Sequence, residues 1–396
     1  MLSKGKNPRS VSIYDPSKAY NGYTLFGPRG SRDMWLINMH GQFVHRWRMP
    51  GLIGDAALLP NGNLLIGSRY PDSAVADIPA CGGKWLELDW DGNLVWKYED
   101  EYMNLHDCER LENGNTLVCF LIPLPDDVTS KVKGGIPGTE RHGVMWSDGI
   151  REISPNGEVV WEWLAHEHMD FDRDVLCPLC SRMIWTYVNS IFALPNGDIL
   201  LSFRHINTIA IVDKISGNFK WMWGPGKLGH QHCPTMVENG NILVFDNGLH
   251  SPSTDNVAAS ASRVLEVSVK NDKIEWEYKA DNITSFYSPI CSSAQRLPNG
   301  NTLICEATKG RLFEITRDQE IVWDFVNPLF FEYQPKYLGW TNMVFRAYRY
   351  GPDFGRLNER SLDTTRFEWV LQGRNDEGSV VDEAQLVADR LKLLGY

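Results

Sequence analysis

Histidine and amide side chains recur at one position relative to a short turn motif. His106, Asn189 and His232 each lie six residues before the first residue of a turn, respectively Glu112-Asn-Gly-Asn115, Pro195-Asn-Gly-Asp198 and Glu238-Asn-Gly-Asn241. Asn104, Tyr187 and His230 lie two residues further upstream. Equal spacing from equivalent turns indicates equivalent places in repeated units, and strand residues two apart share a face. The pattern therefore predicts one shared polar site.

The residue types at this site suit group-transfer chemistry. Arg204 ends the run Leu201-Ser-Phe-Arg204, in the same repeat as Asn189. Two imidazoles, an amide and a guanidinium can hold a tetrahedral oxyanion such as sulfate or phosphate, because arginine presents a planar fork of donors. A neutral imidazole can attack the central atom, and a second can exchange protons near neutral pH.

We expect a catalytic set of five residues: His232, His106, Arg204, Tyr187 and Asn189. The tyrosine can donate a hydrogen bond to an anionic oxygen or protonate a leaving group. The alternative is that these side chains only line a water-filled channel.

A repeat must position these residues. Strand-like runs end at Trp47, Trp96, Trp161, Trp221, Trp276 and Trp323, which are 47 to 65 residues apart. Asn-Gly or a similar pair between two apolar runs is a strong hairpin signal. Each period reads as four short antiparallel strands, which predicts an all-β, six-bladed β-propeller. We expect the tryptophans to pack between neighbouring blades.

The first blade lacks its innermost strand at the N-terminus. Residues 22–26, 33–37 and 42–47 supply three strands, and 342–350 supplies the fourth, so the ring closes without a free edge. We expect a propeller over 1–350. The remainder, 351–396, is a C-terminal extension with an amphipathic helix at 379–394, docked on the ring or serving as a dimerisation arm. A seven-bladed propeller is possible only if the segment 122–148 contains an additional blade.

Four segments resemble the arylsulfotransferase (aryl-sulfate sulfotransferase) family. They are His106-Asp-x-x-x-Leu-x-Asn-Gly-Asn115, Ser202-Phe-Arg-His205, Gln231-His232 with the following Asn239…Gly248, and Gln295…Leu303, within roughly residues 20–350. The resemblance implies a six-bladed propeller that transfers a sulfuryl group from a phenolic sulfate ester to another phenol, without a nucleotide sulfate donor. It implies that His232 is transiently sulfurylated, that His106 and Arg204 bind the sulfuryl oxygens, and that Asn189 assists. Tyr187 departs from the family pattern, which has histidine there.

A metal offers a second possibility. His166-Glu-His168 precedes Cys177-Pro-Leu-Cys180, and two histidines with two cysteines are ligands that suit zinc. Alternatively, this is a surface loop with incidental ligands, or His166 or His168 joins the channel histidines around zinc, copper or iron. The sulfuryl-transfer interpretation itself requires no cofactor.

Four further residues are candidates for contact with a phenolic ligand: His230, His142, Trp340 and Tyr287. His142 belongs to the long Gly- and Pro-rich segment 122–148, which is either a lid over the site or a flexible surface insertion.

The composition excludes several classes of protein. The 396 residues carry a formal net charge of −11, which argues against nucleic-acid or anionic-membrane partners. Eight cysteines in this length are not a disulfide framework. No apolar signal segment is visible near the N-terminus, so we expect a cytoplasmic protein. Possible partners are a small phenolic or aryl-sulfate ligand and a second copy bound through the C-terminal helix. Three functions remain open: a sulfuryl transferase, a metal-dependent enzyme acting on a small aromatic substrate, and a non-catalytic interaction platform.

Overall fold

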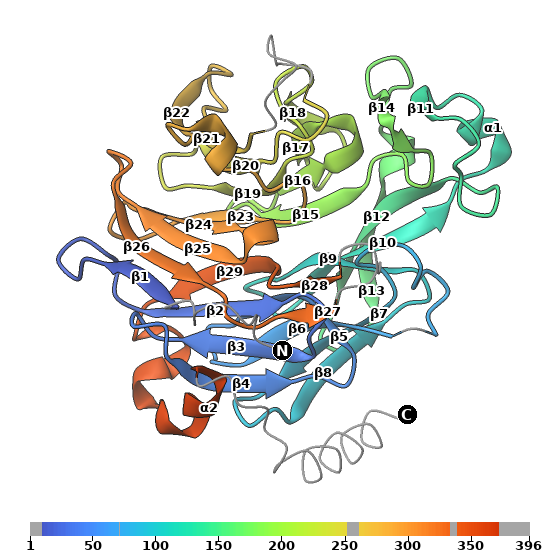
Figure 1. The fold of residues 1–396 in the computed structure, drawn as a ribbon. Helices are drawn as coiled ribbons and strands as arrows, with labels where there is room; N and C mark the ends of the chain where they lie inside the picture. The colour runs from blue at the N-terminus through green and yellow to red at the C-terminus, as the bar shows by residue number, and fades with distance from the viewer. Residues whose placement is uncertain (1–9, 71, 252–260, 333–338, 372–396) are drawn as a thin grey trace. The chain divides into compact units, whose positions relative to one another are not determined.

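The computed structural model describes residues 10–70, 72–251, 261–332 and 339–371 (Figure 1). Its contacts divide the chain into two compact units. The first unit is Met1–Pro71, Gly83–Glu99 and Cys291–Tyr396, and the second unit is Asp72–Gly82 and Asp100–Ile290. Each unit contains three antiparallel sheets, and each of these sheets has four blade strands. These six sheets are the blades of a β-propeller, which confirms the predicted fold class.

The second unit carries the residues expected to do chemistry. Its sheets are β9 (Met103–Arg110), β10 (Thr116–Pro123), β12 (Trp146–Ile153) and β13 (Val159–Leu164); β15 (Val188–Ala193), β16 (Ile199–Phe203), β17 (Thr208–Val212) and β18 (Phe219–Trp223); and β19 (His232–Met236), β20 (Ile242–Asp246), β21 (Arg263–Val267) and β22 (Ile274–Tyr278). The first strand of the middle sheet, β15, lies between β9 and β19 (Figure 1). The three candidate strands are therefore neighbours.

The first unit contains the blade shared by both ends of the chain. Its sheets are β2 (Tyr23–Pro28), β3 (Asp33–Ile37) and β4 (Phe43–Arg48) with β29 (Val344–Tyr350); β5 (Leu52–Leu58), β6 (Leu64–Arg69), β7 (Gly83–Leu88) and β8 (Leu94–Glu99); and β23 (Ser293–Arg296), β24 (Thr302–Glu306), β25 (Arg311–Ile315) and β26 (Ile321–Val326). β29 pairs with β2, with Tyr23 opposite Tyr350. The predicted closing strand is confirmed. A further strand, β1 (Val11–Tyr14), extends the last sheet by pairing with β26.

Four of the five Asn-Gly turns are held by a glutamate on the third strand of the blade. Asn239 and Asn241 donate from Nδ2 to Glu266 Oε1 at 3.0 and 2.9 Å. The same bonds join Asn113 and Asn115 to Glu152. Gly240, inside the turn, has φ +80°, a conformation that glycine adopts without strain. The repeated motif thus combines a turn with a buried carboxylate that satisfies its amides.

Tryptophans of the fourth strands contact the next blade, as the repeat predicts. In the second unit, Trp161 Nε1 donates to the Lys214 carbonyl at 3.0 Å, and Trp223 Nε1 donates to the Asp272 carbonyl at 3.1 Å. Each acceptor lies in the turn before the fourth strand of the following sheet. The indole rings therefore add both apolar area and a directed hydrogen bond between blades.

The segment 122–148 contains no additional blade. It continues β10 into a short helix, α1 (Asp126–Thr129), and a short strand, β11 (Gly134–Ile136). β11 pairs in parallel with β14 (Leu176–Ser181), and this two-stranded sheet stands outside the blades (Figure 1). We refer to β11 and β14 together as the side ribbon.

The C-terminal part described by the structure is mainly short helical turns. These are η6 (Phe354–Glu359), η7 (Thr365–Phe367) and α2 (Glu368–Leu371). The amphipathic helix expected at 379–394 lies outside the described residues. Among the residues that the structure describes, no helix is long and apolar enough to cross a membrane.

Candidate active site

The inner strands of the second unit are irregular where the candidate residues lie. The pairing of β15 with β16 shifts between Val188 and Ser190, and that of β19 with β20 shifts between His232 and Thr235. Tyr187 and His230, just before these strands, have φ values of +56° and +58°. Bulges and left-handed residues redirect side chains, so the strict alternation expected from the sequence does not hold there.

His232 is held by its Nδ1 atom. This buried imidazole has Asn247 Oδ1 at 2.7 Å and the His230 carbonyl at 3.0 Å from Nδ1. Both partners are acceptors, so the proton lies on Nδ1 and the lone pair of the neutral ring lies on Nε2. In a neutral ring held in this way, Nε2 is the nitrogen that carries the lone pair.

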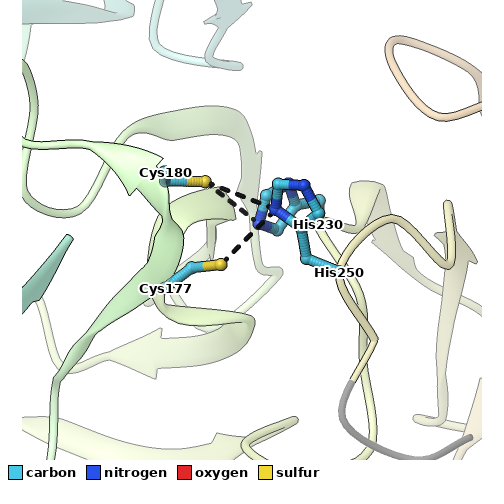
Figure 2. Close-up of side chains that lie close together, drawn as sticks. All are labelled: Cys177, Cys180, His230 and His250. Atoms are coloured by element: carbon cyan, nitrogen blue, oxygen red, sulfur yellow. Dashed lines mark hydrogen bonds between the residues drawn. The ribbon is translucent and has the colours of Figure 1, made fainter. Parts of the chain in front are cut away.

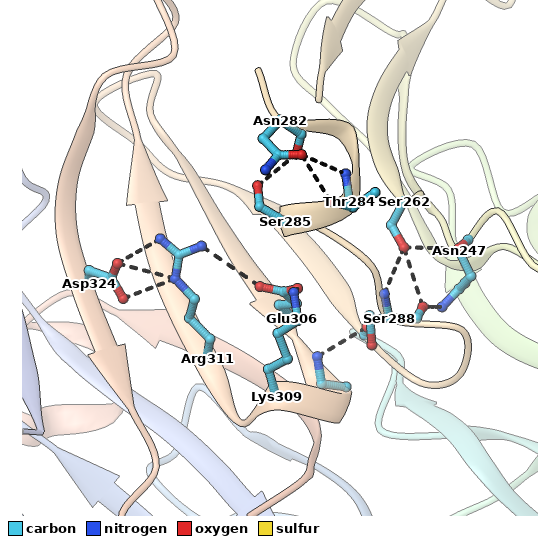
Figure 3. Close-up of polar contacts among 12 residues, drawn as sticks. Asn247, Ser262, Asn282, Thr284, Ser285, Ser288, Glu306, Lys309, Arg311 and Asp324 are labelled. Carbon is cyan, nitrogen blue, oxygen red and sulfur yellow. Dashed lines mark hydrogen bonds and ion pairs between the residues drawn. The ribbon is translucent and has the colours of Figure 1, made fainter. Parts of the chain in front are cut away.

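Asn247 is itself fixed by a polar network (Figure 3). Its Nδ2 donates to the Ser288 carbonyl at 2.7 Å, which orients Oδ1 toward His232. Ser262 Oγ donates to the Asn247 carbonyl at 2.9 Å and accepts from the Ser288 amide at 2.9 Å. The amide of Asn247 therefore cannot turn without breaking buried hydrogen bonds.

His106 on β9 has the same kind of partner. Its Nδ1 lies 2.7 Å from Asn104 Oδ1, while Asn104 Nδ2 donates to the Val188 carbonyl at 3.1 Å. Asn104 Nδ2 also lies 3.4 Å from the buried carboxylate of Asp148, which accepts from Thr186 Oγ1 at 2.6 Å. Burial raises the pKa of Asp148 to about 6. His106 is thus connected through an amide to a carboxyl group that titrates near neutral pH.

Tyr187 lies between two histidines. Its ring centroid is 5.0 Å from that of His106 and 4.6 Å from that of His205. Its hydroxyl donates to the Pro79 carbonyl at 3.1 Å, and the Arg204 guanidinium lies 5.8 Å from the ring centroid. The tyrosine therefore forms an aromatic wall beside His106, with Arg204 next to it.

Asn189 and its neighbours join the three inner strands. Asn189 Nδ2 donates to the Gln231 carbonyl, one residue before β19, at 2.8 Å. Ser190 Oγ donates to Asp107 Oδ2 on β9 at 2.8 Å. These buried bonds hold β15 to both adjacent blades. Asn189 thus has a positioning role that its equivalent place in the repeat did not reveal.

The side chain of His230 belongs to a different cluster from that of His232. It is fully buried, and its Nε2 lies 3.4 Å from Cys180 Sγ. His250 Nδ1 lies 3.5 Å from Cys177 Sγ (Figure 2). The structure thus groups Cys177 and Cys180 with His230 and His250, whereas the sequence suggested His166 and His168 as their partners.

His166 and His168 lie elsewhere in the second unit, at the 3-10 turn η1 (Ala165–Glu167). The His168 ring stacks on Trp163, with centroids 5.2 Å apart and planes at 12°. Within the described residues, neither His106 nor His232 belongs to a group of three or more metal-ligating side chains.

The remaining candidates for ligand contact are dispersed. His142 is exposed, and its Nε2 is 3.9 Å from Asp77. Tyr287 is half-buried and follows η3 (Ile283–Ser285) in the second unit. Trp340 is 59% exposed on β28 (Trp340–Thr341) of the first unit, where it pairs with β27 (Phe331–Glu332).

Sequence reasoning did not identify Asn247, His205 or His250 as site residues. Asn247 and His250 follow β20, in the run Phe245-Asp-Asn-Gly-Leu-His250, which also contains the family-like Asp-Asn-Gly. Arg204 and His205 also come just after the second strand of a blade. This shared position was the sequence signal that could have identified Asn247 and His250 as site residues. Residues after the second strand of a blade reach the same end of the sheet as residues before its first strand.

The chain is a β-propeller whose second unit carries histidine and amide side chains on its inner strands β9, β15 and β19. It belongs to the arylsulfotransferase (ASST) family, whose model matches residues 81–328. No curated protein matches the sequence.

Several solved structures are similar to the chain at low sequence identity. A protein of unknown function from Bacteroides caccae is 15% identical with a TM-score of 0.52, covering 83% of this chain and 98% of that one. Virginiamycin B lyase from Staphylococcus aureus is 10% identical with a TM-score of 0.44, covering 81% and 85%. Kuenenia stuttgartiensis hydrazine synthase is 11% identical with a TM-score of 0.45, covering 80% and 79%. The first of these supports the fold alone.

Proposed function

We propose that the protein transfers a sulfuryl group from a phenolic sulfate ester to another phenol, with His232 as the carrier. Family membership supports the reaction class. The observation that carries the choice of residue is the 2.7 Å contact between His232 Nδ1 and Asn247 Oδ1. It places the lone pair on Nε2 before the substrate binds, which a nucleophilic imidazole requires.

The transfer proceeds in two displacements. In the first, His232 Nε2 attacks sulfur, a nitrogen–sulfur bond forms, and the ester sulfur–oxygen bond breaks. The departing phenolate receives a proton from protonated His106. In the second, the oxygen of the acceptor phenol attacks sulfur, the nitrogen–sulfur bond breaks, and the phenolic proton returns to His106. The two steps require no oxidant, reductant or nucleotide.

Other residues of the site bind the substrate. Arg204 is the permanent cation beside the tyrosine wall, and its donors suit the sulfuryl oxygens. Tyr187 contacts the aromatic ring, and Asn189 fixes β15 against β19. His142, Tyr287 and Trp340 remain candidates for contact with the phenolic part of the ligand.

The test is to trap the sulfurylated protein. Wild-type protein is mixed with an activated aryl sulfate, quenched, and digested for mass spectrometry; phenol is then added to a parallel sample. We expect one SO₃ adduct on the peptide containing His232, and its loss on adding phenol. His232→Ala should form no adduct and should lose turnover, while His168→Gln, a histidine outside the site, should retain both.

Two results would overturn the proposal. One is an absence of turnover by folded wild-type protein across a range of aryl sulfates and pH values. The other is wild-type turnover in His232→Ala, which would exclude this residue as the carrier.

A further inference from the structure

Four side chains of the second unit converge at a point that the proposed transfer reaction does not use. Cys177 and Cys180 lie on β14 of the side ribbon, His230 precedes β19, and His250 follows β20 (Figure 2). Their nearest ligand atoms all lie within 4.8 Å of one another. These residues come from three separate segments, so the tertiary fold alone brings them together.

Three sulfur–nitrogen separations in the cluster are close to the edge length of a zinc coordination tetrahedron. Cys180 Sγ lies 3.4 Å from His230 Nε2 and 3.8 Å from His250 Nδ1, and Cys177 Sγ lies 3.5 Å from His250 Nδ1. With zinc–sulfur bonds of about 2.3 Å and zinc–nitrogen bonds of about 2.0–2.1 Å, tetrahedral geometry requires sulfur–nitrogen separations of about 3.6 Å. The three sulfur–nitrogen separations are therefore close to those that a single tetrahedral zinc ion requires, and the remaining separations are within 4.8 Å.

Burial argues for a metal rather than for a chance cluster. His230 has no exposed surface, and Cys177 and Cys180 are 6% and 8% exposed. Among the described residues, His230 Nδ1 has no hydrogen-bond partner, and its Nε2 meets only thiol sulfur, a weak partner. A coordinate bond from Nε2 to a metal ion would replace this weak contact. Two thiolates also balance a divalent cation, so the buried site would be neutral.

The backbone holds both histidines in an uncommon conformation. His230 has φ +58° and His250 has φ +53°, values that non-glycine residues rarely adopt. Such strain persists where surrounding interactions require it. At both positions, it directs an imidazole toward the thiols of β14.

We infer that Cys177, Cys180, His230 and His250 bind one Zn²⁺ in a closed tetrahedral site. Four protein ligands leave no position for water or substrate, so the ion is structural. Soft thiolates with imidazoles select zinc over the hard cations magnesium and calcium. The inference concerns the fold of the second unit and does not depend on the proposed sulfuryl transfer.

The zinc ion ties the side ribbon to the blade of β19 and β20. It also anchors the residue beside the candidate nucleophile, because the carbonyl of His230 lies 3.0 Å from His232 Nδ1. A side-chain hydrogen bond also joins the guanidinium of Arg204 to Cys180. The metal would therefore hold in place the backbone that orients His232.

The test measures metal content and ligand field. Tag-free protein is purified with a reductant, supplied with zinc, desalted and analysed by elemental mass spectrometry. We expect about one zinc per chain. Cobalt exchanged into the protein should give the intense d–d bands of a tetrahedral ion and thiolate-to-cobalt charge-transfer absorption. These signals report on the site in the wild-type chain, whether or not ligand variants fold.

Ligand variants and matched controls separate this site from other thiols and imidazoles. Cys177→Ser and His250→Gln should weaken zinc affinity by more than about 100-fold, since even loss of an outer-shell partner costs 10–100-fold. Cys108→Ser and His168→Gln, which change a thiol and an imidazole outside the cluster, should bind zinc as the wild type does.

Three results would overturn the inference. Folded, reduced wild-type protein supplied with zinc could retain none. Cobalt could bind without thiolate charge-transfer absorption. Cys108→Ser could lose as much zinc as Cys177→Ser does. In each case the cluster would be a set of thiol and imidazole contacts, and the sulfuryl-transfer proposal would be unaffected.

Discussion

Nδ1 of His232 and Oδ1 of Asn247 lie 2.7 Å apart in the second unit, although the two residues belong to different strand ends. His106 Nδ1 and Asn104 Oδ1 are separated by the same 2.7 Å. In each pair, the asparagine NH₂ group donates to a backbone carbonyl, which fixes the direction of Oδ1. Two histidines, whose blades are separated by the blade of β15, thus each keep a proton on Nδ1.

Asn247→Ala tests the role of this contact. The variant loses the acceptor that favours the Nδ1–H tautomer, so we expect kcat to fall by about 100-fold with little change in KM. Asn247→Asp restores an acceptor and should recover part of kcat. Steady-state kinetics with an aryl sulfate donor provide the measurement. Asn239→Ala, which changes a turn asparagine, should keep the wild-type kcat; equal kcat in Asn247→Ala would contradict the positioning role.

Tyr187→Phe tests whether the Tyr187 side chain only packs beside the substrate or also donates a proton to it. The hydroxyl donates its hydrogen to the Pro79 carbonyl at 3.1 Å, so it has none to give to a substrate in this arrangement. We expect kcat to stay within about twofold of wild type, whereas loss of a general acid costs about 100-fold or more. Unfolding by urea should show a loss of about 1 kcal/mol from the missing hydrogen bond. A large fall in kcat would assign the hydroxyl to catalysis instead.

Arg349→Met tests the closing strand of the first unit. Arg349 Nη1 on β29 lies 3.2 Å from Glu314 Oε2 on β25, and both side chains are 0% exposed. Removing the cation leaves the buried carboxylate of Glu314 without its ionic partner, so the free energy of unfolding should fall by about 3–5 kcal/mol. Denaturant titration followed by tryptophan fluorescence measures the loss.

The control for Arg349→Met is a surface pair of the same unit. Lys18 Nζ lies 2.7 Å from Glu320 Oε1, with side chains 45% and 55% exposed. Lys18→Met should leave the free energy of unfolding almost unchanged because water screens the pair. Similar losses in the two variants would show that the buried pair contributes no more than the exposed one.

Asp148 gives stability a defined pH dependence. Burial raises its pKa from 3.8 in the unfolded chain to about 6. The folded state therefore binds the proton more tightly, and this contribution to stability is complete below pH 4 and lost as pH rises through 6. The change corresponds to about 3 kcal/mol.

The measurement is the difference in unfolding free energy between wild type and Asp148→Asn across pH 4 to 7. The asparagine does not titrate, so the advantage of the wild type should shrink as pH rises. A difference that is constant with pH would show that Asp148 titrates normally. The subtraction cancels other buried carboxyls, such as Glu109, whose pKa burial raises to about 8.

The six blades could be predicted because their signals are local. An Asn-Gly turn between apolar runs specifies a hairpin through the φ preference of its own residues, and counting strands showed that 342–350 completes the first blade. The glutamates that hold these turns also recur in the sequence, but their partnership with the asparagines is visible only once the strands are paired.

The candidate site was predicted in part. Equal spacing from the turns correctly selected His106 and His232 as residues with similar surroundings. It did not anticipate that the backbone at Tyr187 and His230 is left-handed, which breaks the alternation on which the argument relied. A bulge depends on contacts with the neighbouring strand, which periodicity in one segment does not encode.

By itself, the sequence determined the strand repeat, the shared first blade and the family to which the chain belongs. The tertiary structure decided which side chains meet. Cys180 and His230 are 50 residues apart, and their 3.4 Å separation depends on the side ribbon lying against the blade of β19. His166 and His168, much closer to these cysteines in the chain, lie elsewhere. Ligand spacing along a chain reports local geometry, whereas convergence of distant segments is set by the packing of whole sheets.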